Sequence, residues 1–271
     1  MKSLHSCPCS QSHLDRLLNS LPQSLDETYE RMLCKIDPAL VKDARRILTL
    51  LCFASRPLTL PELIDGIAVE TTEPTGLNKD CRLEGYNDIH DICPGFIKFN
   101  VANKRLIVQI AHFSVQEYLE SDRIRHQKAM IFGLTSVKAH TEIAEICLIY
   151  LLESDLSSSV LNHNVLEEYP LAQFAAEYWY SHYKSTEDPA SDLNTLISSL
   201  FQHKESFMTW VKLYDVDGPH SYGKSDATSD TSSNAANPVY YASLLGLNQA
   251  LHELLNAKQH KGIHIASPSC T

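Results

Sequence analysis

Three widely spaced phrases in this chain each pair a helix-start signal with an apolar stripe. They are Leu21–Leu33, Ala54–Leu63 and Ala111–Ser121. Each holds a Ser or Thr followed three residues later by Glu, at Ser24, Thr59 and Ser114. This is the capping-box pattern, in which the hydroxyl accepts from a backbone N–H of the first turn and the carboxylate reaches back. The phrases therefore predict three helices with fixed starting points and a compact, mainly helical fold.

The segment between the second and third phrases contains a predicted β-hairpin. Residues 96–101 and 106–111 are rich in β-branched and aromatic residues and alternate in polarity, with Ala-Asn-Lys-Arg between them. Three predicted helices come before the hairpin: one that starts at Pro38, a short one after Thr59, and a third over Asp88–Cys93. Three helices followed by a hairpin is the order of a winged-helix domain. The predicted fold class is therefore mainly α with one β-hairpin.

Two details of this region are also predicted. The helix that starts at Pro38 carries an apolar stripe from Val41 to Ala54, and its charged residues are expected to lie mostly off that stripe: Lys42, Asp43, Arg45 and Arg46. The segment 71–86 is rich in Thr, Gly, Asn and charge, with a proline inside, and is predicted to be a variable loop.

From about Ser136 the pattern is entirely helical. Predicted helices cover the stripe 139–151, residues 169–183, 193–200 and 207–214, with aromatic side chains as core. Residues 215–236 are dominated by Ser, Asp, Gly, Thr and Asn, which predicts a disordered linker. Residues 237–248 match the start of an ankyrin repeat. A lone repeat cannot bury its own face, so we expect it to dock on the bundle or to stand as a truncated array.

These patterns predict a division of the chain into seven parts. They are a disordered tail (1–13), a helical segment (14–37), a winged-helix domain (38–123), a helical bundle (136–214), a flexible linker (215–236), an ankyrin-like repeat (237–258) and a tail (259–271).

Composition limits the classes of partner. The formal net charge of −10 disfavours nucleic acid and anionic membranes, which require a concentrated basic face. No stretch is long and apolar enough to span a bilayer, and the N-terminus lacks an apolar signal-peptide core, so a cytoplasmic location is expected.

None of the cysteines form a C-x-x-C pair, which argues against structural zinc. Cys34, Cys52 and Cys147 lie in apolar stripes and are expected to be buried thiols.

The segment Gly218–Ser225 satisfies the P-loop pattern. A working P-loop needs a buried strand before it and a helix after it, because the helix N-terminus holds the phosphates. The residues that follow hold nothing larger than Ala to pack a helix, and no parallel sheet is predicted. Aspartates at 215, 217 and 226 add negative charge where a triphosphate would bind. We interpret the match as fortuitous.

Three other groups invite a functional interpretation. His5, Cys7, Cys9 and His13 have metal-ligand chemistry but lie at a polar terminus. His112 beside Ser114 suggests a catalytic pair, yet no carboxylate is placed to orient the imidazole. The third predicted helix of the winged helix, which would read DNA, carries two aspartates and no Arg or Lys and would repel phosphate. We therefore predict no catalytic, cofactor-binding or metal-binding residues.

Taken together, these phrases of the sequence resemble a known family. The phrases 21–33, 56–63 and 111–119 resemble the region after the nucleotide-binding core in fungal NACHT–ankyrin proteins, and that region is similar to the winged-helix segment named after GPI inositol-deacylase. Residues 169–179 are similar to the family's helical segment, and the ankyrin start follows in the expected place. The resemblance covers about Leu14 to Asn256.

The resemblance implies a role in an NLR-like (STAND) switch ATPase, in which the NACHT core and winged helix restrain an effector and ankyrin repeats sense a ligand. The core and its P-loop would precede Met1, and the array stops after one unit, so neither ATPase nor lipase activity carries over. We therefore expect a non-catalytic regulatory module that binds proteins and needs no cofactor. A NACHT-type core is one expected partner. The alternatives are a small nucleotide-binding protein using Gly218–Ser225, a winged-helix DNA-binding regulator, and an incomplete gene product or decayed paralogue.

Overall fold

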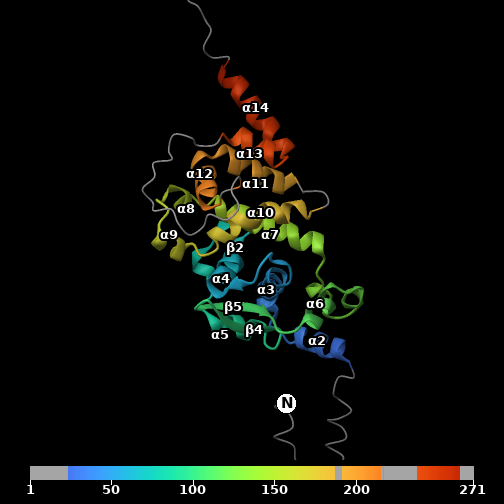
Figure 1. Ribbon diagram of the computed structural model, residues 1–271. Coiled ribbons are helices and arrows are strands. Elements are labelled where there is room, and N and C mark those ends of the chain that lie inside the picture. Colours follow the sequence, from blue (N-terminus) through green and yellow to red (C-terminus); the bar gives the residue numbers. More distant parts are fainter. Residues whose placement is uncertain (1–23, 187–190, 215, 217–236, 263–271) are drawn as a thin grey trace, which may run out of the picture.

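The computed structural model describes residues 24–186, 191–214, 216 and 237–262 (Figure 1). The described residues begin with α2 at one end of the molecule and reach α14 at the opposite end, with the winged helix and the bundle between them. Among the described residues, no helix combines the length and apolar character needed to cross a bilayer.

The winged helix has the predicted order of elements. Its helices are α3 (Val41–Phe53), α4 (Leu60–Ala68) and α5 (Tyr86–Ile92), and its hairpin is β4 (Ile97–Ala102) with β5 (Arg105–Ile110). Asn103 and Lys104 form the two-residue turn with φ of 50° and 63°, which suits the twist of the flanking strands. The prediction of a mainly α fold with a β-hairpin is confirmed.

A third strand, which the sequence did not predict, completes this sheet. β1 (Leu58–Thr59) pairs antiparallel with β5, so the strand order is β1-β5-β4. Val108 of β5 lies opposite both Leu58 and Phe99 and is fully buried. Two residues are too short a run to give a period-2 signal. The strand explains why α4 starts where it does, since Thr59 both ends β1 and caps α4.

Two of the three predicted helix caps are correct, and one is wrong. Ser24 accepts from the Glu27 backbone N–H at 3.1 Å and opens α2 (Leu25–Leu33). Thr59 forms a complete capping box with Glu62. The third helix, α6 (Phe113–Glu120), is instead capped by His112, whose Nδ1 accepts from the Ser114 N–H at 3.2 Å.

The hydroxyl of Ser114 has other partners. Its Oγ lies 2.7 Å from Nδ1 of His112 and 2.7 Å from the phenol oxygen of Tyr29 on α2. The helix therefore begins two residues earlier than the capping-box pattern indicated. The serine instead ties α6 to α2, whose Tyr29 and Leu33 are buried in the core.

Three further expectations about this region need correction. The predicted loop 71–86 holds β3 (Gly76–Leu77), which pairs with β2 (Val69–Glu70), and the short 3-10 helix η3 (Lys79–Cys81). Arg46 was expected to lie off the buried stripe of α3, but only 5% of it is exposed, because the bundle covers that side. Cys34 is exposed rather than buried because it caps the end of α2, whereas Cys147 is buried as expected.

The second half of the chain is helical. It comprises α7 (Ser136–Leu151), α8 (Ser154–Ser158), α9 (His163–Glu168), α10 (Ala172–Lys184), α11 (Ser191–Gln202) and α12 (Lys204–Leu213). The helix predicted from residue 169 starts only at Ala172. Tyr169 precedes a proline and adopts φ −120°, ψ 66°, because the proline ring disfavours helical backbone at that position.

The C-terminal helix pair packs on this bundle. It consists of α13 (Pro238–Leu244) and α14 (Asn248–Gly262), so α14 runs past residue 258. Tyr241 is buried with its ring 5.7 Å from that of Trp210 and 5.8 Å from that of Phe207. Tyr180 donates to the Leu245 carbonyl at 2.5 Å. Of the two arrangements expected for this pair, the structure therefore shows docking on the bundle.

Candidate functional site: the interface between winged helix and bundle

The most distinctive site is the domain interface, by which we mean the contact of α3, α4 and η3 with α7, α9 and α10. Its apolar part is close-packed around Gly66 of α4. A Cβ at Gly66 would lie 3.0 Å from Cδ1 of Leu50 and 3.9 Å from Cδ2 of Leu171. The glycine therefore lets α4 approach both α3 and the segment that leads into α10.

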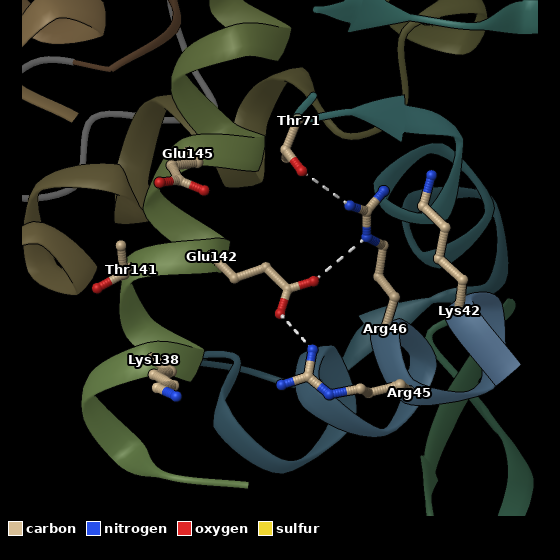
Figure 2. A pocket seen from close by; sticks show the side chains of 8 residues that line it. All are labelled: Lys42, Arg45, Arg46, Thr71, Lys138, Thr141, Glu142 and Glu145. Carbon is tan, nitrogen blue, oxygen red and sulfur yellow. Dashed lines mark hydrogen bonds and ion pairs between the residues drawn. The ribbon is translucent and has the colours of Figure 1, made fainter. Parts of the chain in front are cut away.

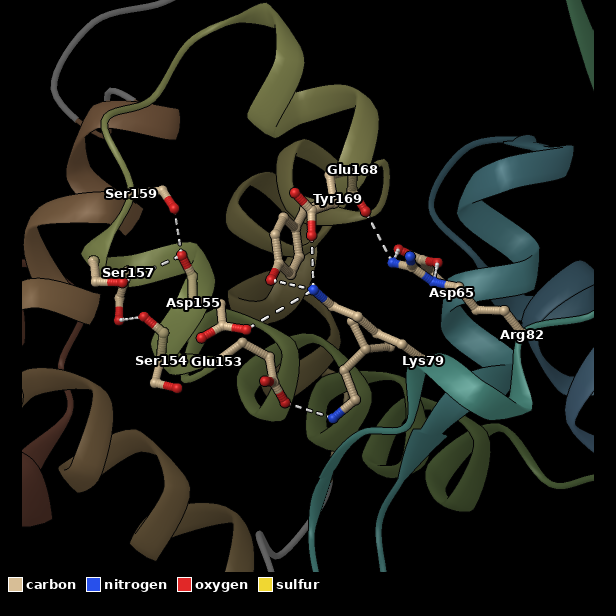
Figure 3. A network of polar contacts seen from close by, with 12 residues as sticks. Asp65, Lys79, Arg82, Glu153, Ser154, Asp155, Ser157, Ser159, Glu168 and Tyr169 are labelled. Atoms are coloured by element: carbon tan, nitrogen blue, oxygen red, sulfur yellow. Dashed lines mark hydrogen bonds and ion pairs between the residues drawn. The ribbon is translucent and has the colours of Figure 1, made fainter.

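A buried carboxylate lies beside this apolar contact. Asp65 of α4 is 2% exposed, and Oδ1 lies 2.7 Å from Nε of Arg82 while Oδ2 accepts from Nη2 of Arg82 at 3.0 Å (Figure 3). Tyr150 of α7 donates its hydroxyl to Oδ2 as well. Burial raises the pKa of Asp65, and the Tyr150 hydrogen bond and the Arg82 charge oppose that rise. Arg82 also donates to the Glu168 carbonyl at 2.9 Å, so three separate segments meet at one carboxylate.

Lys79 of η3 forms a second, more exposed contact across the interface. Its Nζ donates to Glu168 at 2.8 Å and to the Tyr169 hydroxyl at 2.7 Å, and lies 4.5 Å from the centre of the Tyr169 ring (Figure 3). These hydrogen bonds raise the pKa of Lys79 and lower that of Glu168. Both side chains are substantially exposed, so we expect this pair to contribute little to stability.

Arg46 of α3 supplies a third contact across the interface. Its guanidinium donates to the carbonyls of Ile67 and Val69, to the Thr71 hydroxyl at 3.2 Å, and to Glu142 of α7 at 3.3 Å. A planar guanidinium with five donors suits such a set of acceptors. Arg46 therefore holds the end of α4, the start of β2 and α7 together.

Arg56 connects the winged helix to α10 through an aromatic face. It forms a two-pronged ion pair with Glu62, at 2.9 and 2.7 Å, and Glu62 is the same residue that closes the capping box of α4. The guanidinium carbon lies 5.1 Å from the ring centre of Phe174 and 5.8 Å from that of Tyr178. Cation–π contacts of this kind add to the ion pair.

Two histidines complete the interface at the end of α3. His182 of α10 is 1% exposed, its Nδ1 lies 2.8 Å from Nδ1 of His140 on α7, and its Nε2 lies 3.1 Å from Oγ of Ser55. Burial, together with the neighbouring His140, lowers the pKa of His182 to about 4. Burial also lowers the pKa of His140, so the environment favours the neutral form of both rings.

This arrangement fixes the orientation of the winged helix relative to the bundle. A buried ion pair is geometrically demanding, because every lone pair and proton needs a partner, and few relative orientations satisfy all of them.

Among residues 24–186, 191–214, 216 and 237–262, no group of three or more His, Cys, Asp or Glu could hold a metal ion.

The sequence patterns described above do not predict this interface. One signal was present: Asp65 interrupts the apolar run Leu63–Ile67, where a charge is out of place unless it has a buried partner. The partners Arg82 and Tyr150 are 17 and 85 residues away in sequence, and no local pattern connects them.

The residues singled out from the sequence have different outcomes. Gly218–Ser225 and the group His5, Cys7, Cys9 and His13 lie outside the described residues, so those interpretations stay predictions. His112 and Ser114 do form a hydrogen bond, but the histidine serves as a helix cap and the serine also bonds Tyr29.

The fold defines a winged-helix protein with an attached helical bundle, and a comparison with known protein families finds the same winged-helix domain. Residues 29–131 match the winged helix domain of GPI inositol-deacylase. The chain is also 46% identical over 253 residues to the azaphilone pigments biosynthesis cluster protein L of Monascus ruber. That alignment covers 92% of this chain and 54% of the relative, so the chain spans about half the relative's length. No solved structure matches the chain.

Proposed function

We propose that this chain is a non-catalytic regulatory module of the cytoplasm that binds a protein partner, with a NACHT-type nucleotide-binding core as that partner. The observation that carries the proposal is the domain interface, where Asp65, Arg46 and His182 hold the two halves in one orientation. A movement imposed on the winged helix would therefore carry the bundle with it. Rigid-body movement of this kind is a common way to pass a signal between sites.

Exposed apolar side chains support a protein partner at the end of the molecule away from the bundle. Among the described residues, ten large apolar side chains are exposed, and four of them lie on α2, α6 and the short 3-10 helix η5 (Met130–Phe132). The four are Leu25, Phe113, Met130 and Ile131, exposed by 61%, 72%, 66% and 57%. We call these four residues the α2–α6 face. Large apolar side chains exposed on elements at one end of a molecule favour a protein-binding role for that end.

The electrostatics of the winged helix favour protein over DNA. Its third helix, α5, carries Asp88 and Asp91, and the Asp91 side chain is 82% exposed. A DNA-reading helix needs cations to offset the phosphates, and these carboxylates would repel them.

The relative supplies the context for the partner. It is about twice as long as its match to this chain. We propose that in a protein of that length the partner surface lies in the same polypeptide. Its name connects it with azaphilone pigment biosynthesis. We extend the proposal accordingly: the process that this module regulates is a biosynthetic pathway of that kind.

The test is a binding measurement with a purified NACHT core from the same cell. We expect a saturable complex with the full chain. For the double variant Phe113→Ser/Ile131→Ser, the dissociation constant should be at least about tenfold larger. Val160→Ser is the matched control, because Val160 is 82% exposed but lies between α8 and α9. The absence of any complex, or equal affinity for all three proteins, would contradict the proposal.

A further inference from the structure

A solvent-open cavity lies where α3 of the winged helix faces α7 of the bundle. Its volume is about 450 Å³, and its walls come from both helices (Figure 2). Ligand pockets are typically of this size and often lie between domains. We call it the α3–α7 cavity, and it is lined by Lys42, Arg45, Arg46, Thr71, Lys138, Thr141, Glu142 and Glu145.

The lining is rich in cations although the chain as a whole carries a net charge of −10. Arg46 is already engaged by four acceptors. The guanidinium of Arg45 is less engaged, because its ion pair with Glu142 is long, at 3.7 Å, and its side chain is 34% exposed. Lys138 is exposed and forms no ion pair with any residue of the described ranges. The donors of Arg45 and Lys138 are therefore available to a ligand.

The neighbouring groups do not cancel this positive charge. Glu142 lies between Arg46, at 3.3 Å, and Arg45, so its own charge is compensated. The Thr71 hydroxyl accepts from Arg46 at 3.2 Å, which leaves its proton to donate to an anion.

At the other end of the cavity, the carboxylate of Glu145 needs a hydrogen-bond donor, whereas Arg45 and Lys138 need acceptors. Glu145 lies two turns along α7 from Lys138 on the same helix face (Figure 2). It makes no hydrogen bond or ion pair with a described residue, although it is half-buried. Burial and the nearby Glu142 raise the pKa of Glu145. A donor from outside the chain would satisfy this carboxylate.

We infer that the α3–α7 cavity binds a small ligand with an oxyanion at one end and a hydrogen-bond donor at the other. Arg45 and Lys138 hold the oxyanion, and Glu145 accepts from the donor. Guanidinium and ammonium groups are the usual partners of phosphate and carboxylate. Because the ligand would touch α3 and α7 together, its binding would tighten the domain interface.

Calorimetric titration of the full chain at constant ionic strength tests the inference. The probes are inorganic phosphate, phosphoethanolamine and β-alanine, which separate the oxyanion from the ammonium group and phosphate from carboxylate. We expect saturable binding of phosphoethanolamine or β-alanine, and the one that binds identifies the preferred oxyanion. If phosphate is preferred, phosphoethanolamine should bind about tenfold tighter than inorganic phosphate. Failure of both two-ended probes to saturate would overturn the inference.

Variants assign the two ends of the ligand. Arg45→Gln/Lys138→Gln should weaken binding of the preferred probe at least about tenfold. Glu145→Gln should remove the advantage of a probe with an ammonium group over one without. Lys98→Gln/Arg105→Gln, at two exposed positions of the β4–β5 hairpin, is the charge-matched control and should bind like the unaltered chain. Circular dichroism shows that each variant is folded, and unchanged binding in the double variant would overturn the assignment.

Discussion

At the scale of single residues, burial decides which charged contacts of this protein matter. Asp65 is 2% exposed and meets Arg82, whereas Lys42 pairs with Glu70 at a similar distance while its side chain is 59% exposed. Removing one partner of a buried pair leaves a charge without compensation, whereas an exposed charge keeps its water. The two pairs look alike as contacts and should differ widely in their effect on stability.

We predict that Arg82→Leu lowers the free energy of unfolding by about 3 kcal/mol, because Asp65 remains buried without its cation. Lys42→Gln, the exposed counterpart, should change it by less than about 1 kcal/mol. Urea denaturation of both variants and the unaltered chain measures the difference. Equal effects of the two substitutions would show that Asp65 finds water or a proton at no cost.

His182 gives the protein a pH dependence with a definite sign. Its pKa in the folded chain is about 4, below the value of an exposed histidine, so the folded state binds fewer protons than the unfolded state. Stability is therefore complete above the unfolded pKa of about 6.5 and falls as the pH drops from there towards 4. The loss amounts to ~3 kcal/mol at the end of that window.

We predict that His182→Gln removes this part of the pH dependence. Denaturation of both proteins at pH 7 and pH 4.5 gives the comparison, since carboxylates titrate alike in the two. A slope between these pH values as steep in the variant as in the unaltered chain would show that His182 does not carry the effect.

At the scale of elements, the caps show where local sequence rules hold and where a distant contact overrides them. Ser24 and Thr59 cap their helices as the pattern predicts because the backbone N–H groups they accept from lie three residues away. Ser114 has the same pattern, but its hydroxyl lies beside Tyr29, 85 residues earlier, and His112 caps the helix instead. Element types were predictable from the sequence, and the use of individual side chains was predictable only where the partner was local.

We predict that His112→Ala destabilises the chain by about 1 kcal/mol, the usual effect of losing an N-cap acceptor. His112→Asn restores a side-chain acceptor and should stay within about 0.5 kcal/mol of the unaltered chain. Thermal and urea unfolding of the two variants tests this. If alanine and asparagine destabilise equally, the histidine acts through something other than its cap.

The domain interface shows a second limit of sequence-based reasoning at this scale. Arg46 follows Arg45 directly and shares its chemistry, yet Arg46 is only 5% exposed, whereas 34% of the Arg45 side chain is exposed. Helical periodicity assigned both to the polar side, because it takes no account of a second domain that packs there. The winged-helix order was predictable, whereas the interface depended on tertiary packing across about 100 residues of sequence.

At the scale of the whole molecule, the interface makes the winged helix and the bundle thermodynamically interdependent. Both tryptophans, Trp179 and Trp210, lie in the bundle, 5.7 Å apart and fully buried, so indole fluorescence reports on that half alone. Far-UV circular dichroism reports on all helices. Coincidence of the two signals is therefore a test of coupling.

We predict that the two unfolding transitions coincide in the unaltered chain. Arg82→Leu, although it lies in the winged-helix half, should shift the fluorescence midpoint as much as the dichroism midpoint. The fluorescence shift is the informative one, because Arg82 is remote in sequence from both tryptophans. A fluorescence transition that stays in place while dichroism shifts would mean that the halves unfold independently.

The path of the chain through the molecule has a mechanical consequence. The described residues enter at α2 and leave at α14, at opposite ends (Figure 1). The domain interface thus holds α2 and α14 apart as the two ends of one rigid body. Breaking the contacts around Asp65 would turn that rigid body into two halves joined by a hinge, and α2 and α14 could then change their distance from one another.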